Sequence, residues 1–482
     1  MSTTTPKKIG ENQYQIDADS NSGMKVPVRI YADEPLLQKM LSDRTIMQAK
    51  NVSSIPGIVG QSIVLPDGHE GYGFPVGGVA AMDAEEGMIS PGGVGYDINC
   101  GVRLLRSNLT EKDVRSKLKE LVTDLFSSIP SGVGSKGSVK LTPSQLDEVL
   151  VKGVNWAIDN GYGSSDDADV CEENGQIQNA DPNKVSDKAR KRGAPQLGSL
   201  GSGNHFLEVQ KVAEVHDEEA ANRMGLKEGT ITVLIHCGSR GFGHQVCSDY
   251  LRVAEQAMSK YDIDLPDREL ACVPNNSEEG ESYRAAMFSA LNFAWSNRQM
   301  LTHWTRKSIE RVFNQSESDL DMKLVYDVAH NIAKVEKHKV DGKERKVVVH
   351  RKGATRAFPA NRDEIPSKYR DLGQPVLVPG SMGTASWVLL GQPNSMDLSF
   401  GSTAHGAGRT MSRTKARRNF SEEDVKKSLN DKGIFIKALT RDGVVEETPQ
   451  AYKDVDAVVN VSHNLGIATK VAKLVPIGVI KG

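Results

Sequence analysis

Residues 91–106 read PGGVGYDINCGVRLLR, a glycine-rich loop that runs into an apolar segment. Asp97 and Cys100 stand three positions apart in this loop. Glycine lets backbone and ligands approach one another closely. A carboxylate and a thiol in such a loop are unusual for an ordinary core, so the stretch predicts a site whose other members lie elsewhere in the chain.

The segments around this loop predict a mixed α/β (α+β) protein with much sheet. Residues 55–106 alternate short apolar runs with glycines, which is typical of strands and loops. Asp341-Gly342 separates two further strand-like runs and predicts a tight hairpin. Residues 1–10 are expected to form a tail. Other strands are predicted at 230–236, 323–335, 345–351 and 374–379, and helices at 35–50, 111–126, 143–158, 248–260 and 279–315, with a basic, partly helical segment at 410–431.

Composition excludes several classes of protein. The net charge is −2, so no global basic field points to nucleic acid, and a polyanion would have to meet local patches. Five cysteines in 482 residues do not make a disulfide framework. No run approaches the length of a membrane span, and we expect a cytoplasmic protein. Residues 163–193 are polar and predict a surface excursion.

Three histidines occur where a strand pattern gives way to glycine or to a polar residue: His205, His236 and His330. Imidazole, thiolate and carboxylate are the usual ligands of transition metals. With Asp97 and Cys100 they make five potential ligands, which is more than a single tetrahedral metal site with an open position needs. The set suits two ions that share a ligand, and a thiolate can bridge. The softness of these ligands alone favours zinc or cobalt. The alternative to a metal site is that the histidines have purely structural roles.

Strand alternation at 204–209 would turn Asn204 and Glu208 to one face and His205 to the other. His205 would then hold a metal while Asn204 and Glu208 face a neighbouring pocket. In the alternative, Asn204 caps a turn and Glu208 is solvated.

His405 lies in a second glycine-rich element, DLSFGSTAHGAGRTMSR, at 397–413. Its small neighbours would admit a bulky ligand, either as a metal ligand or as a nucleophile that attacks phosphorus. Basic side chains in loops are candidates for phosphate contacts, with simple solvation as the alternative: Arg240, Lys352, Arg409 and Arg413.

Two motif matches carry little weight. GVGSKG at 132–137 fits a G-x-G-x-x-G pattern but does not join a strand to a helix. KVDG at 339–342 matches a nucleotidyltransferase lysine motif but falls in the predicted hairpin turn.

With these residues assembled, the chain resembles the RtcB family of tRNA-splicing ligases. The matching stretches follow one another through most of the chain: PDGHEGYGFPVGG (66–78), GGVGYDINCGVRLLRS (92–107), LGSGNHFLEV (200–209), IHCGSRGFGH (235–244), YDVAHN (326–331), VHRKGATRAF (349–358), VPGSMGT (378–384) and STAHGAGR (402–409). The resemblance implies an RtcB-type fold with central β-sheets flanked by helices. Because the implied site draws on residues from 97 to 405, we expect one domain over 1–482.

The family joins RNA ends that carry a 3′-phosphate or a 2′,3′-cyclic phosphate to a 5′-hydroxyl, using GTP and Mn²⁺. The resemblance implies that Cys100 bridges two manganese ions, with Asp97 and His205 on one and His236 and His330 on the other. Manganese would then replace the zinc or cobalt that softness favoured. His405 would carry GMP, with Asp67 as a helper. The implied guanylate contacts are Asn204, Glu208, His330, Asn331, Pro379, Gly380, Ser381, Met382, Ser386, His405, Gly406, Ala407, Gly408, Tyr452 and Lys481.

The implied partners are RNA, either tRNA halves or other cleaved ends, and the activator archease. Two other functions fit the same ligand set. A binuclear metallohydrolase of phosphoesters would need no covalent histidine, and a metal-stabilised RNA-binding protein would need no catalysis.

Overall fold

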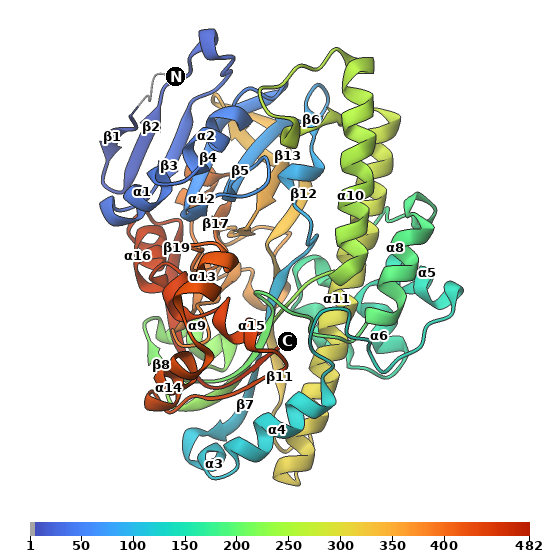
Figure 1. Cartoon of the computed structure of the whole chain (residues 1–482), viewed down its shortest axis with the longest axis vertical. Helices are drawn as coiled ribbons and strands as arrows, with labels where there is room; N and C mark the ends of the chain where they lie inside the picture. Colours follow the sequence, from blue (N-terminus) through green and yellow to red (C-terminus); the bar gives the residue numbers. More distant parts are fainter. Residues whose placement is uncertain (1–4) are drawn as a thin grey trace.

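In the computed structural model, residues 5–482 are described, and they form two large sheets with helices packed around them (Figure 1). The first is a 7-stranded sheet in which β3 and β4 pair in parallel and the other neighbours are antiparallel. In spatial order its strands are β1 (Lys7–Gly10), β2 (Gln13–Ile16), β3 (Val28–Tyr31), β4 (Ile58–His69), β5 (Val76–Asp83), β13 (Lys343–Lys352) and β12 (Asn331–Val340).

The second is an 8-stranded sheet, counting β18 (Phe435–Ala438), which pairs in parallel with β19. Its main path is antiparallel. In order the strands are β11 (Lys323–Ala329), β7 (Gly101–Thr110), β9 (Thr230–Cys237), β8 (Phe206–Val215), β19 (Ala468–Lys481), β16 (Ser386–Gly391) and β15 (Pro375–Val378). Two short pairs complete the strands: β6 (Met88–Ile89) with β10 (Val273–Pro274), and β14 (Ala354–Arg356) with β17 (Ser402–Ala404).

The helices lie outside the sheets, and the longest is α11 (Glu278–Phe313), a helix of 36 residues. Figure 1 shows α11 running beside α10 (Arg240–Ala257) along one side of the molecule, with α5, α6 and α8 beyond them. The other helices are α1 (Glu34–Leu41), α2 (Thr45–Val52), α3 (Glu111–Arg115), α4 (Leu118–Ser128), α5 (Pro143–Lys152), α6 (Val154–Asp159), α7 (Ser165–Asp169), α8 (Asp187–Gly193), α9 (Glu218–Met224), α12 (Asn394–Ser399), α13 (Arg413–Asn419), α14 (Glu422–Asp431), α15 (Arg441–Val445) and α16 (Val455–Asn464). Among the described residues no helix has the length and apolar character to cross a membrane.

The two sheets are joined directly at His330. β11 of the second sheet ends at Ala329, and β12 of the first begins at Asn331. A chain that changes sheets within one residue brings the strand ends of both sheets together. The site described below lies at this junction.

Most predicted elements are confirmed, including the mixed α/β class and the hairpin. Asp341 and Gly342 both have positive φ, 50° and 79°, and connect β12 to β13. This is the backbone that a two-residue type I′ turn requires. The predicted helix at 35–50 is instead two helices, because Asp43 accepts hydrogen bonds from the backbone and hydroxyl of Thr45 and starts a new helix there.

Two expectations about exposed segments were wrong in part. Residues 7–10 of the predicted tail form edge strand β1, while residues 1–4 lie outside the described part of the chain. Within the predicted surface excursion at 163–193, residues 167–172 are buried except for Asp169, which is exposed. The buried acidic side chains pair with buried cations: Asp167 with Arg306 at 2.7 Å, and Glu172 with Lys334 at 2.6 Å. The charged residues of this segment therefore include some that form internal ion pairs as well as some that lie on a solvated face.

Candidate active site

The register of the second sheet brings four of the predicted metal ligands together at one end of its strands. Gly101 at the start of β7 pairs with Cys237 at the end of β9 on one side and with Ala329 at the end of β11 on the other. His236 pairs with Phe206, the first residue of β8. Because these strands are antiparallel neighbours, the residues that flank their ends meet: Cys100, His205, His236 and His330.

The donor atoms of these residues lie close together and are mostly buried. Asp97, Cys100 and His205 each offer one ligand atom within 4.8 Å of the other two. Cys100 Sγ lies 3.6 Å from His205 Nε2 and 3.2 Å from His236 Nε2, and His205 Nε2 lies 2.8 Å from Asp97 Oδ2. The rings of His236 and His330 follow with centroids 5.5 Å apart. The structure therefore brings all five predicted ligands into one cluster, in which Cys100 is central.

Two of the imidazoles are oriented as metal ligands usually are. Nδ1 of His205 lies 3.1 Å from the Leu200 carbonyl oxygen, and Nδ1 of His330 lies 2.9 Å from the Thr355 hydroxyl. Such outer contacts fix the tautomer and present Nε2 to a cation. Within residues 5–482, Nε2 of His330 is buried and has no hydrogen-bond partner. A buried nitrogen without a partner, beside a thiol and a carboxylate, fits a bound transition metal ion.

The electrostatics of Cys100, His236 and His330 agree with that fit. Burial, and next the negative charge of Asp97, raise the pKa of the Cys100 thiol to about 11, so a nearby cation is needed to hold the thiolate. Burial, followed by the positive charge of His205, lowers the pKa of His236 well below its usual value. Burial and the charge of His405 do the same to the pKa of His330. Neutral imidazole is the form that binds metal. Burial acts to lower the pKa of His205, but the charges of Cys237 and Asp97 raise it well above its usual value, so a bound cation would have to displace the His205 proton.

A residue in the middle of α11 supports the loops that carry the predicted metal ligands. Arg298 is fully buried and donates from Nη1 to the backbone carbonyls of Asn99 and Cys237, each at 2.9 Å. Its Nη2 donates to Asp327 at 2.7 Å. Asn99 and Cys237 are the neighbours of Cys100 and His236, so this one guanidinium fixes the backbone beside two of the clustered side chains.

His405 is held next to this cluster by Asp67. Nδ1 of His405 lies 2.5 Å from Asp67 Oδ2, and the same oxygen accepts the backbone N–H of His405 at 2.9 Å. The His405 ring centroid is 5.2 Å from that of His330. Burial acts to raise the pKa of Asp67, but the charge and hydrogen bonds of His405 lower it overall. Asp67 is therefore an ionised, buried acceptor that leaves Nε2 of His405 free.

Cys100, His236, His330 and His405 border a pocket of about 300 Å³. Most of the residues predicted for guanylate line it: Asn204, His330, Asn331, Pro379, Gly380, Ser381, Met382, His405, Gly406, Ala407, Gly408, Tyr452 and Lys481. Cys100 and His236 also line it. Of the remaining predicted site residues, Asp67, Asp97, His205, Glu208, Arg240 and Ser386 lie outside its wall.

Glu208 and Ser386 connect to the pocket through a polar chain. Gln210 donates to Glu208 at 2.7 Å and to Ser386 at 3.1 Å, and the Ser386 hydroxyl accepts the backbone N–H of Gly380 at 3.2 Å. Burial raises the pKa of Glu208 to about 8. The solvated alternative for Glu208 is thus wrong, because this carboxyl lies inside the sheet.

The alternation predicted at 204–209 was wrong at its first two positions. β8 begins only at Phe206, so Asn204 and His205 belong to the preceding loop. Both side chains approach the same sulfur: Asn204 Nδ2 lies 3.9 Å and His205 Nε2 3.6 Å from Cys100 Sγ. The rule that successive side chains point to opposite faces holds only within a strand, so it does not apply to Asn204 and His205.

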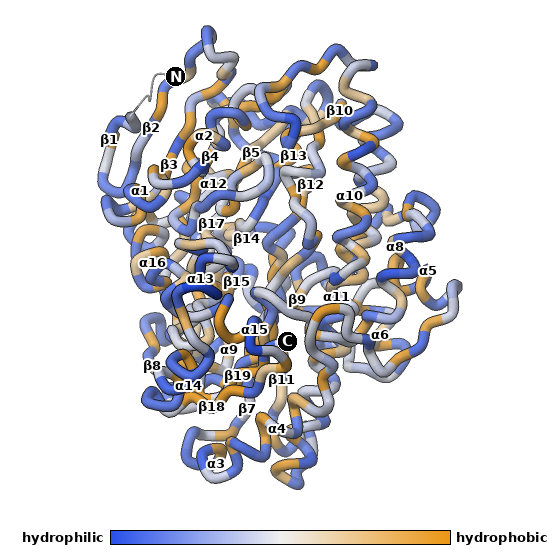
Figure 2. The backbone as a smooth tube through the Cα atoms, in the orientation of Figure 1, coloured by the Kyte–Doolittle hydropathy of each residue, from blue (hydrophilic) through white to orange (hydrophobic). Residues whose placement is uncertain are grey.

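The four side chains predicted to contact phosphate differ in exposure and in how many other protein groups they already bind. Arg409 is paired with Glu447 at 3.1 Å and also donates to the Glu446 carbonyl at 2.8 Å. Arg413 bonds Glu447 at 2.9 Å but keeps 46% of its side chain exposed. Arg409, Arg413 and Lys352 line the pocket, whereas Arg240 is half-buried outside it. Figure 2 shows α13, which begins at Arg413, as a strongly hydrophilic segment beside this region.

Sequence reasoning missed several residues of the pocket wall: His69, Val76, Gly95, Tyr96, Phe206, Gly353 and Glu447. Six of these lie inside the motifs quoted for the family, so proximity to a matched motif was a usable signal for all of them except Glu447. Arg298 was also missed. Its signal is the polar run Ser296–Gln299 in the middle of an otherwise apolar helix.

Comparison with known proteins gives consistent matches. The family model described as tRNA-splicing ligase RtcB matches residues 48–482. A protein named tRNA-splicing ligase RtcB from Thermococcus kodakarensis is 60% identical over 476 residues, which cover 99% of this chain and 98% of that protein. Proteins of the same name from Aeropyrum pernix and Methanococcus maripaludis are 56% and 53% identical over 478 and 479 residues, with 99% of this chain covered in each case and 99% and 100% of those proteins.

Proposed function

The chain belongs to the RtcB family of tRNA-splicing ligases, which are RNA ligases, and from this premise we propose a GTP- and Mn²⁺-dependent reaction at the pocket. The RNA end that carries a 2′,3′-cyclic phosphate or a 3′-phosphate is joined to a 5′-hydroxyl end through a GMP-histidine intermediate on His405. The observation that carries the proposal is the position of His405, between an ionised buried carboxylate and a cluster of thiolate, carboxylate and imidazole ligands.

The residues that would hold two Mn²⁺ ions are Asp97, Cys100, His205, His236 and His330, with Cys100 shared because its sulfur lies between the imidazoles of His205 and His236. When bound, such ions neutralise charge on the attacking and leaving oxygens of a phosphoryl transfer. The buried Nε2 of His330, which lacks a protein partner in the described chain, supports this assignment.

Asp67 prepares His405 for nucleophilic attack. By accepting the Nδ1 proton it fixes the tautomer whose Nε2 carries a lone pair, as a carboxylate does for histidine in other covalent catalysts. Nε2 attacks the α-phosphorus of GTP, and pyrophosphate leaves. The bond from Nε2 to phosphorus then breaks as GMP passes to the RNA 3′-phosphate, and finally the 5′-hydroxyl attacks that phosphate and expels GMP. A cyclic phosphate is first opened by water.

The pocket wall on the far side of His405 is suited to a nucleotide. Gly406 lines the pocket next to His405, and Lys481 supplies positive charge near Tyr452. Gly408 lets the chain pass close to Asp67, since a Cβ at this position would lie 2.2 Å from the Asp67 carbonyl oxygen. Glu208 and Ser386 act through Gln210 and the backbone of Gly380. The RNA phosphates are assigned to Lys352, Arg409, Arg413 and Arg240, and Arg413 is favoured over Arg409 because both bind Glu447 but more of the Arg413 side chain is exposed.

A single ligase domain over 1–482 and a cytoplasmic location, both expected from the sequence, stay predictions. So do the partners that the family resemblance implies: tRNA halves or other cleaved RNA as substrate, and archease as an activator.

Ligation tests the proposed function. An RNA with a 2′,3′-cyclic phosphate and a second RNA with a 5′-hydroxyl are incubated with the protein, GTP and Mn²⁺. A joined product that depends on GTP supports the proposal and eliminates a purely RNA-binding role. Hydrolysis of the cyclic phosphate without joining, at any GTP concentration, would instead favour the binuclear phosphoesterase.

A further inference from the structure

Three aromatic side chains form a row beside the pocket. The rings of Tyr72 and Tyr96 meet edge to face with centroids 5.5 Å apart and an angle of 65°. The rings of Tyr96 and His244 are stacked with centroids 5.5 Å apart and an angle of 24°. Both tyrosines are half-buried and His244 is exposed. The row therefore begins inside the molecule and ends in solvent.

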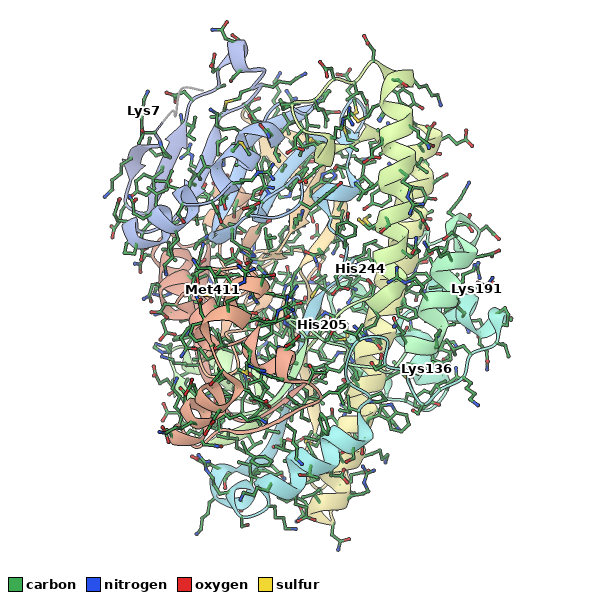
Figure 3. All side chains as sticks on the ribbon, in the orientation of Figure 1. Lys7, Lys136, Lys191, His205, His244 and Met411 are labelled. Atoms are coloured by element: carbon green, nitrogen blue, oxygen red, sulfur yellow. The ribbon has the colours of Figure 1, made fainter. Side chains whose placement is uncertain are left out.

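The row meets the candidate active site at its middle member, Tyr96. Tyr96 lines the pocket and immediately precedes Asp97 of the ligand cluster. His244 lies on the first turns of α10, whose preceding strand, β9, ends next to His236. In Figure 3 His244 is labelled near the middle of the molecule, in the same region of the view as His205.

Cationic side chains flank the row. Lys352 lines the pocket with Tyr96, and its ammonium group donates to the Tyr72 carbonyl. Arg240, at the start of α10, donates from Nε to the Ser199 hydroxyl at 3.3 Å, and the positive charges of Arg192 and Arg240 both contribute, after burial, to a lowered pKa of His244. Arg192 donates to Gln245, the residue after His244, at 2.9 Å. Cations thus border the aromatic row at both of its ends.

Aromatic rings beside a positively charged track are how proteins bind single-stranded nucleic acid without reading its sequence. Two stacked rings that reach from a catalytic pocket to solvent are poorly explained by core packing, because the outer ring is exposed. Neither ring has a part in guanylate transfer as described above. The flanking cations are placed to meet the phosphates on either side of a stacked base.

We propose that the Tyr96–His244 pair is a base-stacking platform, which holds a nucleobase of the RNA end next to the reacting phosphate. Tyr72 supports Tyr96 from behind. This inference rests on the proposed function and deepens it, since it assigns a subsite for the RNA base. Stacking accepts every base, so the platform binds RNA ends of any sequence and orients them by position.

The test uses the full-length protein with Mn²⁺ and RNA that contains 2-aminopurine, whose fluorescence falls when the base stacks. The probe is placed at the last nucleotide of the 3′-phosphate strand in one arm and at the first nucleotide of the 5′-hydroxyl strand in the other. We expect quenching in one arm, which identifies the strand. His244→Ala and Tyr96→Ala should remove the quenching and raise the KM for that RNA about 5- to 100-fold, whereas Tyr96→Phe should retain both.

His303→Ala is the matched control, because His303 also packs on a tyrosine, Tyr162 at 5.2 Å, but neither residue lines the pocket. It should leave quenching and KM unchanged. Wild-type protein that forms the GMP adduct from GTP but quenches neither probe would overturn the platform while leaving the proposed function standing. Absence of the adduct in wild-type protein would instead overturn the proposed function. Equal loss of quenching in Tyr96→Phe and Tyr96→Ala would also contradict the platform, because a ring remains in the former.

Discussion

Asp67 Oδ2 lies 2.5 Å from His405 Nδ1, although the two residues are 338 positions apart in the chain. The same oxygen also accepts the His405 backbone N–H, so one carboxylate sets both the position and the tautomer of the ring. The pair joins strand β4 of the first sheet to the loop after β17.

Replacing Asp67 by asparagine should therefore slow guanylylation of His405. The amide keeps the volume and one acceptor but loses the negative charge that stabilises the imidazole as it attacks. We expect the initial rate of adduct formation from labelled GTP to fall about 100-fold or more, with the thermal midpoint little changed. Glu70→Gln, in the same segment but exposed, is the control. A rate within threefold of wild type in Asp67→Asn would contradict the assignment.

Cys100→Ser should weaken the binding of Mn²⁺. The hydroxyl does not ionise near neutral pH and cannot supply the shared thiolate, so we expect substoichiometric manganese by elemental analysis and at least a tenfold weaker Kd by calorimetry. Cys272→Ser removes another buried thiol that does not line the pocket, and should bind manganese like wild type. Unchanged stoichiometry and affinity in the Cys100 variant would exclude a ligand role for this residue.

Arg298→Met should destabilise the whole fold. It leaves the carbonyls of Asn99 and Cys237 without their donor and halves the cationic pairing of buried Asp327. The loss of one partner from a buried ion pair is expected to lower the free energy of unfolding by about 3–5 kcal/mol, measured by urea denaturation. On α10, exposed Arg252→Met should change it by less than about 1 kcal/mol. Equal effects in the two variants would show that the guanidinium of Arg298 has no special role.

Glu208 gives a pH dependence of stability with a definite sign. Its pKa is raised from 4.5 to about 8 in the folded protein, so between these values the folded chain keeps a proton that the unfolded chain releases. This group therefore contributes stability below about pH 4.5 that is progressively lost as the pH rises to 8. Relative to Glu208→Gln, wild type should lose about 3 kcal/mol between pH 5.5 and 8, as measured by denaturation at each pH. A difference that stays constant or grows with pH would mean that Glu208 is ionised in the fold.

The features predicted correctly from the sequence are those that depend on residues close together in the chain. Asp341-Gly342 carries its turn geometry in two residues, and the strand at 230–236 carries its own periodicity. The cluster around Cys100 was expected because three histidines share the same strand-end context. What local pattern does not encode is register. The meeting of Cys100, His236 and His330 depends on which strands are neighbours, and Arg298 reaches Asn99 across 199 positions.

The errors have the same origin. Asp167 and Glu172 were expected at the surface because a single sequence does not show their partners, Arg306 and Lys334, with which they are buried. Asn204 and His205 were assigned to a strand that begins two residues later, since glycine loops blur element boundaries. Long-range pairing of this kind also forms the aromatic row from Tyr72 to His244.

Mass spectrometry of the protein after incubation with GTP and Mn²⁺ tests the central claim most directly. The account predicts one acid-labile GMP, located on the peptide that contains His405 and missing from His405→Ala. A GMP adduct on any other residue, or an adduct that persists in His405→Ala, would contradict it.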